Sequence, residues 1–408
     1  MHTEIFIIGA GAAGLMCAVQ AAWLGHEVVV AEHERHPAQK LNITGKGRCN
    51  VTNNCDVQTV LNNIPRNSKF LYSALSRFTP EDTMAFFESL GVELKTERGN
   101  RVFPVSDSAK DISGALINAA KNAGVRFVRD DIRSLMIEDG SCIGARGRTE
   151  EYFADRVVVA TGGLSYPKTG SDGSGYKLAR QAGHSVTECL GSLVGVEMYG
   201  SDCAKAMGLS LKNCGLTVRD NTSGKAVYRE QGEMLFTHFG MSGPLVLSAS
   251  AHMENIEKGR YSLLIDFKPA LDEEKLDERI LRDFGDVPNR DFGNSLGRLL
   301  PASIIPVMIS RSGISEVKKV NQITRAEREK LVRTIKSFEL EVKGLRPVEE
   351  AIITRGGVEV KEISPKTMES KLVKGLHFIG EVIDADAYTG GFNLQIAWAT
   401  AYAAAESF

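Results

Sequence analysis

The chain has 408 residues, and its 49 basic and 51 acidic side chains leave a formal net charge of -2 at pH 7. A chain of this length exceeds what one hydrophobic core usually organises, so we expect two or three domains. The near-neutral charge argues against a broad positive field for nucleic acid and favours a small-molecule substrate. Seven cysteines without a C-x-x-C pair argue against a disulfide framework and a zinc site. We therefore expect a cytoplasmic protein with no metal, no nucleic-acid partner and no membrane span.

The first 32 residues have the pattern of a βαβ unit. Residues 5–8 form an apolar run that ends at Gly9 and predicts a buried strand. Residues 15–24 are rich in alanine and predict a helix closed by Gly25, and residues 28–30 predict the next strand. Handedness rules place the two strands in one parallel sheet, which is the nucleus of a doubly wound domain.

Further elements of the same domain follow in chain order. Thr79 and Pro80 predict a helix start, because threonine caps the helix and proline occupies its first position. The alternation over 92–105 predicts a hairpin around a turn at 97–100. A second helix is predicted at 109–123, and strands are predicted near 125–128, 135–137 and 156–160.

The pattern changes after Gly183 and reads as α+β. Hairpin-like alternation occupies 227–236, a helix is predicted after Pro244, a strand at 261–267, and a capping box at 324–327 opens a charged helix. The sequence pattern of a parallel sheet returns near Leu376. We interpret the chain as a first domain, 1–190 and 345–408, interrupted by an inserted α+β substrate domain at 191–344.

The sequence GAGAAG at 9–14 matches the dinucleotide-binding fingerprint, because it follows a predicted strand and opens a predicted helix. Gly9 permits the tight turn, Gly11 lets the backbone approach a pyrophosphate, and Gly14 lets the helix pack on the strand. Glu32, at the end of the next strand, is placed to bind the ribose hydroxyls and disfavours a 2′-phosphate. The expected dinucleotide is therefore FAD or NAD rather than NADP.

Three distant glycine-rich segments favour FAD over NAD, since the ribityl chain and isoalloxazine need contacts far from the ADP site. They lie at 161–163, at 170–175 and at 380–391. Gly380 and Glu381 follow a predicted strand, and Glu381 and Asp384 are candidates for the ribityl hydroxyls. A helix starting after Gly391 offers free N–H groups to the reduced flavin.

The segment 40–50 reads as a loop whose cations and glycines face the cofactor. Cys49 within it is more simply explained as an inert thiol than as a redox group. The residues expected to contact the cofactor are Gly9, Gly11, Ala12, Ala13, Gly14, Glu32, His33, Lys40, Leu41, Gly45, Gly47, Arg48, Asn50, Thr161, Gly162, Gly163, Gly380, Glu381, Asp384, Gly390, Gly391, Phe392, Asn393 and Leu394.

Five segments together resemble one known group. They are GAGAAG at 9–14, KLNITGKGRCNVTN at 40–53, ATGGLSYPKTGSDGSGY at 160–176, GEMLFTHFGMSGP at 232–244 and GEVIDADAYTGGFNLQIAWATAYAA at 380–404. The chain resembles the BaiN-like bacterial NAD(P)/FAD-dependent oxidoreductases, a family that includes an aminoacetone oxidase and a 3-dehydro-bile-acid reductase. The resemblance implies an α/β fold in which a glutathione-reductase-type FAD-binding Rossmann-like domain is interrupted by a partly barrel-like α+β domain, with FAD bound non-covalently.

Three functions remain open at this point. The first is a reductase that takes electrons from NADH or NADPH and saturates an activated C=C bond in a small organic substrate. The second is an amine oxidase that produces hydrogen peroxide, and the third is a flavin-dependent RNA-associated protein, which the charge disfavours. Flavin chemistry requires few side chains beyond those that orient the reactants. His238 is the candidate proton donor, although a structural role explains it more simply.

Overall fold

The computed structural model describes residues 2–408. The chain divides into two compact units, the first made of Met1–Ser192 with Val348–Phe408 and the second of Leu193–Pro347. The boundaries expected from the sequence, after residues 190 and 344, lie two and three residues before these. Each unit has a hydrophobic core of its own, so the second unit packs separately although its sequence interrupts that of the first.

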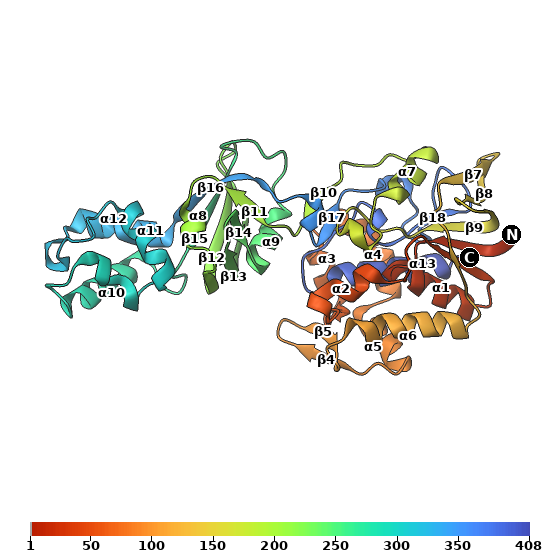
Figure 1. The fold of residues 1–408 in the computed structure, drawn as a ribbon, viewed down its shortest axis with the longest axis horizontal. Coiled ribbons are helices and arrows are strands. Elements are labelled where there is room, and N and C mark those ends of the chain that lie inside the picture. The colour runs from red at the N-terminus through yellow and green to blue at the C-terminus, as the bar shows by residue number, and fades with distance from the viewer. Residues whose placement is uncertain (1) are drawn as a thin grey trace. The chain divides into compact units, whose positions relative to one another are not determined.

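The first unit is built on a seven-stranded sheet in the order β6-β2-β1-β9-β8-β7, with β18 also paired to β9 (Figure 1). The strands β6, β2, β1, β9 and β18 run parallel, whereas β8 and β7 extend the sheet as an antiparallel hairpin. Their bounds are β1 His2–Ile8, β2 Val28–Glu32, β6 Arg126–Arg129, β7 Ser134–Glu138, β8 Ser141–Arg146, β9 Glu151–Val159 and β18 Leu376–Phe378.

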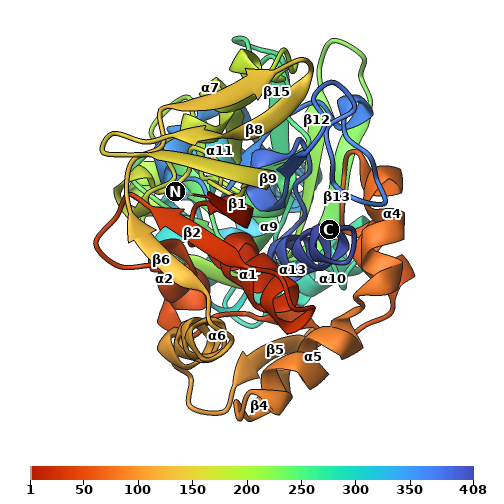
Figure 2. The ribbon, with the colours of Figure 1, turned by 90° about the vertical axis from the view of Figure 1, so that its right-hand side faces the viewer.

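Helices pack against this sheet, and the first and last helices of the chain, α1 and α13, pack against each other (Figure 2). Helix α13 lacks a polar face, and its Trp398 is fully buried and donates its ring N–H to the carbonyl of Val51 at 2.9 Å. The helices of the first unit are α1 Ala12–Trp23, α2 Gln39–Gly47, α3 Val57–Asn62, α4 Ser68–Arg77, α5 Pro80–Ser89, α6 Ala109–Asn122, α7 Ser174–Gln181 and α13 Phe392–Ala405, with 3-10 turns η1 Pro167–Thr169, η6 Val348–Glu350, η7 Val360–Glu362 and η8 Gly380–Val382.

Two small antiparallel sheets complete the first unit. One has the order β3-β5-β4 and contains the expected hairpin, and the other pairs β10 with β17. The second pairing joins the chain where it leaves the first unit to the segment where it returns. Their bounds are β3 Thr52–Asn53, β4 Leu94–Glu97, β5 Arg101–Pro104, β10 Leu190–Ser192 and β17 Ile353–Arg355.

The second unit contains a closed antiparallel barrel in the order β11-β14-β13-β12-β15-β16. The barrel closes because β16, at the end of the unit, pairs with both β15 and the short first strand β11. Its strands are β11 Val196–Met198, β12 Ser210–Asp220, β13 Ala226–Phe236, β14 Gly240–Ser242, β15 Tyr261–Asp266 and β16 Phe338–Leu345. Helices α8 Asp202–Lys205, α9 Pro244–Ser250, α10 Glu273–Gly285, α11 Ile305–Ser312 and α12 Arg325–Lys336 belong to the same unit, with 3-10 turns η2 Phe292–Asn294, η3 Leu296–Arg298, η4 Ala302–Ile304 and η5 Val320–Gln322.

The fold is the expected α/β architecture, with a Rossmann-type unit interrupted by a partly barrel-like α+β unit. The predicted capping box is present at Thr324 with Glu327, and the predicted capping Thr79 forms a second capping box with Asp82. One expectation was wrong: the segment expected as a loop at 40–50 is helical from Gln39. The helix breaks at Thr44–Lys46, where the backbone leaves helical angles, so only the second half of the segment behaves as a loop.

Within residues 2–408, we find no helix that combines the length and the apolar character needed to cross a lipid bilayer.

Candidate functional site

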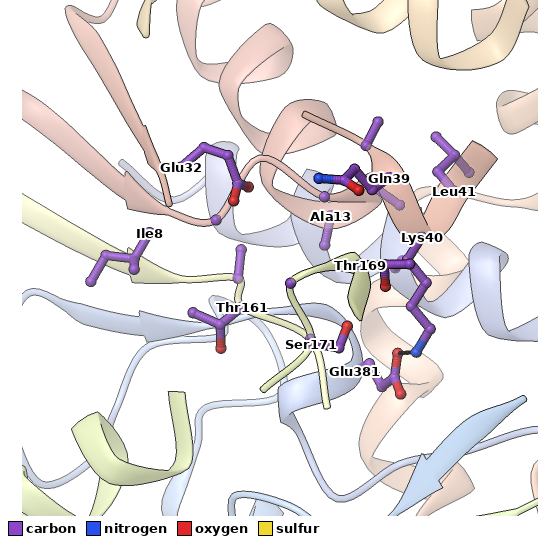
Figure 3. A pocket seen from close by; sticks show the side chains of 18 of the residues that line it. Ile8, Ala13, Glu32, Gln39, Lys40, Leu41, Thr161, Thr169, Ser171 and Glu381 are labelled. Carbon is purple, nitrogen blue, oxygen red and sulfur yellow. Dashed lines mark hydrogen bonds and ion pairs between the residues drawn. The ribbon is translucent and has the colours of Figure 1, made fainter. Parts of the chain in front are cut away.

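A cavity in the first unit runs along the carboxyl ends of the parallel strands (Figure 3). Each of the five parallel strands contributes a residue at or directly after its carboxyl end to the cavity lining. These residues are Gly9 after β1, Glu32 at the end of β2, Asp130 after β6, Ala160 after β9 and Ile379 after β18. Ligands of open parallel sheets bind at this edge, because crossover connections leave a crevice there. The candidate site therefore extends along the carboxyl edge of the parallel strands, from β6 to β18.

Many of the expected contact residues line this cavity. They are Gly9, Gly11, Ala12, Ala13, Glu32, His33, Lys40, Leu41, Thr161, Gly162, Glu381, Asn393 and Leu394.

The glycine turn after β1 has the geometry that its sequence predicts. Gly9 has φ +103°, and a Cβ there would lie 2.7 Å from the carbonyl oxygen of Ala160. A Cβ on Gly14 would lie 1.9 Å from the carbonyl oxygen of Gly9, so the close packing of helix on strand needs glycine. Gly11 differs, because a Cβ there meets no protein atom within 4 Å and the residue lines the cavity. The free space beside Gly11 suits a ligand, and the N-terminus of α1 favours a negatively charged one.

Glu32 is held in place by the backbone around the turn. Its carboxylate accepts hydrogen bonds from the N–H groups of Ala10 and Glu34, both at 2.9 Å. Each bond engages one carboxylate oxygen, and each oxygen keeps a second acceptor site. The acid at the end of β2 is thus oriented before any ribose binds.

We expect Glu32→Ala to weaken FAD binding by about 10- to 100-fold, because each charge-assisted hydrogen bond contributes roughly 1.5 to 3 kcal/mol. Titration of the apoprotein with FAD, followed by flavin fluorescence, measures the dissociation constant. Glu27→Ala is the control, since Glu27 is exposed and paired with Arg126 at the opposite end of the strand. An unchanged dissociation constant in Glu32→Ala would remove Glu32 from the site.

The other end of the cavity contains an ion pair between Lys40 and Glu381. The ammonium of Lys40 lies 2.6 Å from Glu381 Oε2 and 2.6 Å from Ser165 Oγ. Glu381 Oε1 accepts from the backbone N–H of Thr354 at 3.0 Å. We expected Lys40 to bind the pyrophosphate and Glu381 to bind the ribityl chain. In the structure these two side chains form an ion pair with each other.

The start of α13 reaches the cavity through Asn393 and Leu394. The Asn393 side chain accepts from the N–H of Ala387 at 2.8 Å and donates to its carbonyl at 2.7 Å, which holds the loop before the helix. Gly391 precedes the helix with φ +98°, and a Cβ there would lie 2.3 Å from the carbonyl oxygen of Thr52. The start of α13 therefore borders the cavity, and the expectation that its free N–H groups face the reduced flavin stays a prediction.

The residues that line the cavity fit a dinucleotide. The free space beside Gly11 and the N-terminus of α1 suit a pyrophosphate, and the carboxylate of Glu32 suits a ribose. Thr161 also belongs to the lining, but its hydroxyl is buried against Gly175, where an added Cβ would lie 2.1 Å from it.

The remaining predicted residues lie outside the lining, and several have structural roles. Arg48 binds Glu97 and Asp107 and lies 4.1 Å over the ring of Phe103, so its charge is used away from the cavity. Burial raises the pKa of the Asp384 carboxyl above its ordinary value. The residues outside the lining are Gly14, Gly45, Gly47, Arg48, Asn50, Gly163, Gly380, Asp384, Gly390, Gly391, Phe392 and His238.

All seven cysteines are free thiols. Burial raises the pKa of the Cys49 thiol to about 12, so this residue remains protonated at neutral pH and lacks the thiolate needed for redox chemistry.

Sequence reasoning missed the residues after β6 that line the cavity, Asp130, Asp131 and Ile132. Asp130 is buried and accepts from Thr149 Oγ1 at 2.7 Å and Tyr152 Oη at 3.0 Å. Burial raises the pKa of the Asp130 carboxyl, but the hydrogen bonds from the Thr149 and Tyr152 side chains and from backbone N–H groups together lower it by more, so the pKa lies below its ordinary value. One signal in the sequence could have indicated these residues, because they directly follow the strand predicted near 125–128. That this strand lies beside β2 is shown only by the strand order of the folded sheet.

The Rossmann fold, the glycine turn at the N-terminus of α1 and the carboxylate at the end of β2 define a dinucleotide-binding protein of the flavoprotein class. A family model described as the HI0933-like protein Rossmann domain matches residues 3–407, and the chain belongs to this family. This match, together with a full-length relative that is a bile-acid reductase, confirms the BaiN-like resemblance, and the protein is an FAD-dependent flavoprotein oxidoreductase.

Three relatives are similar over nearly their whole length. The 3-dehydro-bile acid delta(4,6)-reductase of Clostridium scindens is 32% identical over 98% of this chain and 98% of its own. The ribosomal RNA dihydrouridine synthases of Escherichia coli (strain K12) and Haemophilus influenzae are 30% and 32% identical, over 99% and 100% of this chain and 97% and 98% of their own.

A solved structure shows the same fold at low identity. The 3-ketosteroid delta1-dehydrogenase of Sterolibacterium denitrificans, in complex with 1,4-androstadiene-3,17-dione, is 12% identical and superposes with a TM-score of 0.51, covering 100% of this chain and 99% of that one.

Proposed function

We propose that this flavoprotein reduces a carbon–carbon double bond that is conjugated to a carbonyl group, with NADH or NADPH as the electron donor. The observation that carries the proposal is the shared chemistry in the names of the full-length relatives. A delta(4,6)-reductase of a 3-oxo compound saturates a conjugated double bond. Dihydrouridine differs from uridine by saturation of a ring double bond that is conjugated to a carbonyl.

The cavity residues would hold FAD along the carboxyl edge of the sheet. Gly11 and the N-terminus of α1 would bind the pyrophosphate, and Glu32 would bind the adenosine ribose. The start of α13 would lie at the isoalloxazine, where its N–H groups favour negative charge. Bound FAD supplies hydride transfer, so the protein's task is to orient the two reactants and exclude water.

The chain offers one glycine fingerprint of the G-x-G-x-x-G form. A nicotinamide donor would therefore dock transiently beside the flavin rather than in a dinucleotide fold of its own. The small-molecule enone is the primary substrate class, because the overall charge gives no broad positive field for a polyanion. A uracil ring in ribosomal RNA is the second candidate, favoured by the names of two relatives.

The visible spectrum of the purified protein under anaerobic conditions tests the donor. We expect a yellow flavin band that bleaches on addition of NADH or NADPH and returns on addition of a 4-en-3-one steroid. A band that returns only with ribosomal RNA identifies the RNA substrate. A band that no nicotinamide bleaches, but that a small primary amine does, contradicts the proposal and identifies an amine oxidase.

His238 is the proposed proton donor in the second unit. Its side chain is exposed and packs edge to face on Phe239, with ring centroids 5.1 Å apart. We expect His238→Ala to keep FAD bound and to lower kcat by at least about 100-fold, the usual contribution of a general acid. His26→Ala, in the first unit, is the control. Turnover equal to that of the wild type would leave His238 with a structural role only.

A further inference from the structure

Four segments of the first unit converge on one polar cluster that borders the cavity. Lys40 comes from α2, Ser165 from the segment after β9, Thr354 from β17 and Glu381 from η8. Ser165 Oγ accepts from the Lys40 ammonium at 2.6 Å and donates to Glu381 Oε1 at 3.1 Å. We call these four residues the Lys40–Glu381 cluster.

The two charges in this cluster are rigidly placed. The side chains of Lys40 and Glu381 are 21% and 12% exposed, and Figure 3 shows Lys40 reaching across the cavity wall to Glu381. Thr354 Oγ1 accepts from the N–H of Leu164 at 2.7 Å, so the backbone on both sides of the cluster is fixed as well. A Cβ on Gly163 would lie 2.3 Å from Thr354 Oγ1 and 2.7 Å from Glu381 Oε1, so the backbone at Gly163 packs directly against the cluster.

The cluster borders the cavity beside the glycine turn, on the side away from Glu32 (Figure 3). Ala38, two residues before Lys40, donates its N–H to the carbonyl of Ala10 at 2.9 Å, and a Cβ on Gly380, directly before Glu381, would lie 2.8 Å from the Cβ of Ala13. In the proposed placement of FAD, the adenosine ribose lies at Glu32 and the pyrophosphate at the glycine turn. Since FAD is an extended molecule, a pair on the far side of the glycine turn from Glu32 lies where the cofactor continues toward the flavin.

We propose that the Lys40–Glu381 pair sets the reduction potential of the bound flavin. The reduced flavin carries more negative charge than the oxidised form, so the ammonium of Lys40 favours reduction and the carboxylate of Glu381 opposes it. Both charges are largely shielded from water. Electrostatic interactions are stronger in such a shielded environment than in bulk solvent. The cluster acts through charge, and it takes no part in bond making. The inference rests on the placement of FAD in the proposed function and is independent of which substrate is reduced.

Opposite shifts of the potential distinguish this role from a structural one. We expect Lys40→Met to lower the midpoint potential and Glu381→Gln to raise it, each by at least about 30 mV, which for a two-electron couple is a tenfold change in the ratio of reduced to oxidised flavin. The double variant should return close to the wild-type value. Anaerobic reductive titration against a reference dye measures all three.

Lys46→Met is the matched control, because Lys46 is exposed, lies six residues further along the chain where helix α2 is broken, and is outside the cavity lining. Its potential should equal that of the wild type. Flavin fluorescence gives the FAD dissociation constant of each variant, so a loss of occupancy is separated from a change of potential. If Lys40→Met binds too little FAD for the titration, Glu381→Gln alone decides the sign.

Potentials that shift in the same direction in both single variants, or that stay within 10 mV of the wild type, would overturn the proposal and leave the cluster a purely structural link. Failure of the substrate class gives a different result: the potentials would still shift oppositely while no conjugated double bond is reduced. A wild-type protein that binds no FAD would refute the placement on which both rest.

Discussion

Gly11→Val is expected to give a folded protein that is colourless. A side chain at this position meets no protein atom within 4 Å, and the backbone of Gly11 has φ -80°, which valine adopts without strain. The side chain would instead occupy the part of the cavity where the pyrophosphate approaches the backbone. We expect the FAD dissociation constant to rise at least about 1000-fold, or about 4 kcal/mol. The absorbance of the purified protein near the flavin band, relative to that of the protein, measures occupancy.

Gly344→Val is the matched control for this loss. A Cβ on Gly344 also meets no protein atom within 4 Å, and the residue lies in strand β16 of the second unit, outside the cavity. The control should keep its FAD, and both variants should keep the far-ultraviolet circular dichroism of the wild type. Full FAD occupancy in Gly11→Val would refute the assignment of the glycine turn.

Arg66→Met is expected to destabilise the first unit by about 3 kcal/mol. The carboxylate of Asp386 is 1% exposed, bonds to Arg66, and accepts from Ser192 Oγ at 2.7 Å. Removing the arginine leaves a buried charge with less compensation, which costs more than the pair itself contributes. The pair also ties the loop before α4 to the glycine-rich segment before α13, so FAD binding should weaken as well.

Thermal unfolding of the FAD-loaded protein checks this expectation. For a unit of this size, 3 kcal/mol corresponds to a fall in Tm of roughly 6 to 12 °C. Arg77→Met is the control, because its ion pair with Glu406 is 36% exposed on both sides and contributes at most about 1 kcal/mol. Equal values of Tm for the two variants would show that Asp386 finds other partners when Arg66 is removed.

The glycine turn, the helix starts and the last helix could be predicted from the sequence. Their signals are local, since capping boxes, glycine spacing and apolar periodicity involve residues within a few positions of each other. The acid at Glu32 was also predictable, because the fingerprint places it at the end of the second strand. Such features need no knowledge of what lies opposite them in the folded chain.

Partners distant in the chain could not be predicted. Arg48 was expected at the cofactor, but Glu97 and Asp107 bind it across the β4–β5 hairpin. An arginine has the same chemistry for a phosphate as for a carboxylate, so composition alone does not choose between them. The first half of α2 was missed for a similar reason. The N–H of Ala38, the residue before this helix, donates to the carbonyl of Ala10 in the glycine turn, which is distant in the sequence.

The amino-acid sequence by itself determined the cofactor class, the family and the interrupted two-unit organisation, since these depend on motifs and on the order of elements along the chain. Only the tertiary structure decided which charges pair with each other. Lys40 and Glu381 are 341 residues apart, and they meet because β18 pairs with β9 and brings η8 beside α2. The physical reason is that an ion pair depends on distance in space, which chain separation does not specify until the strands have paired.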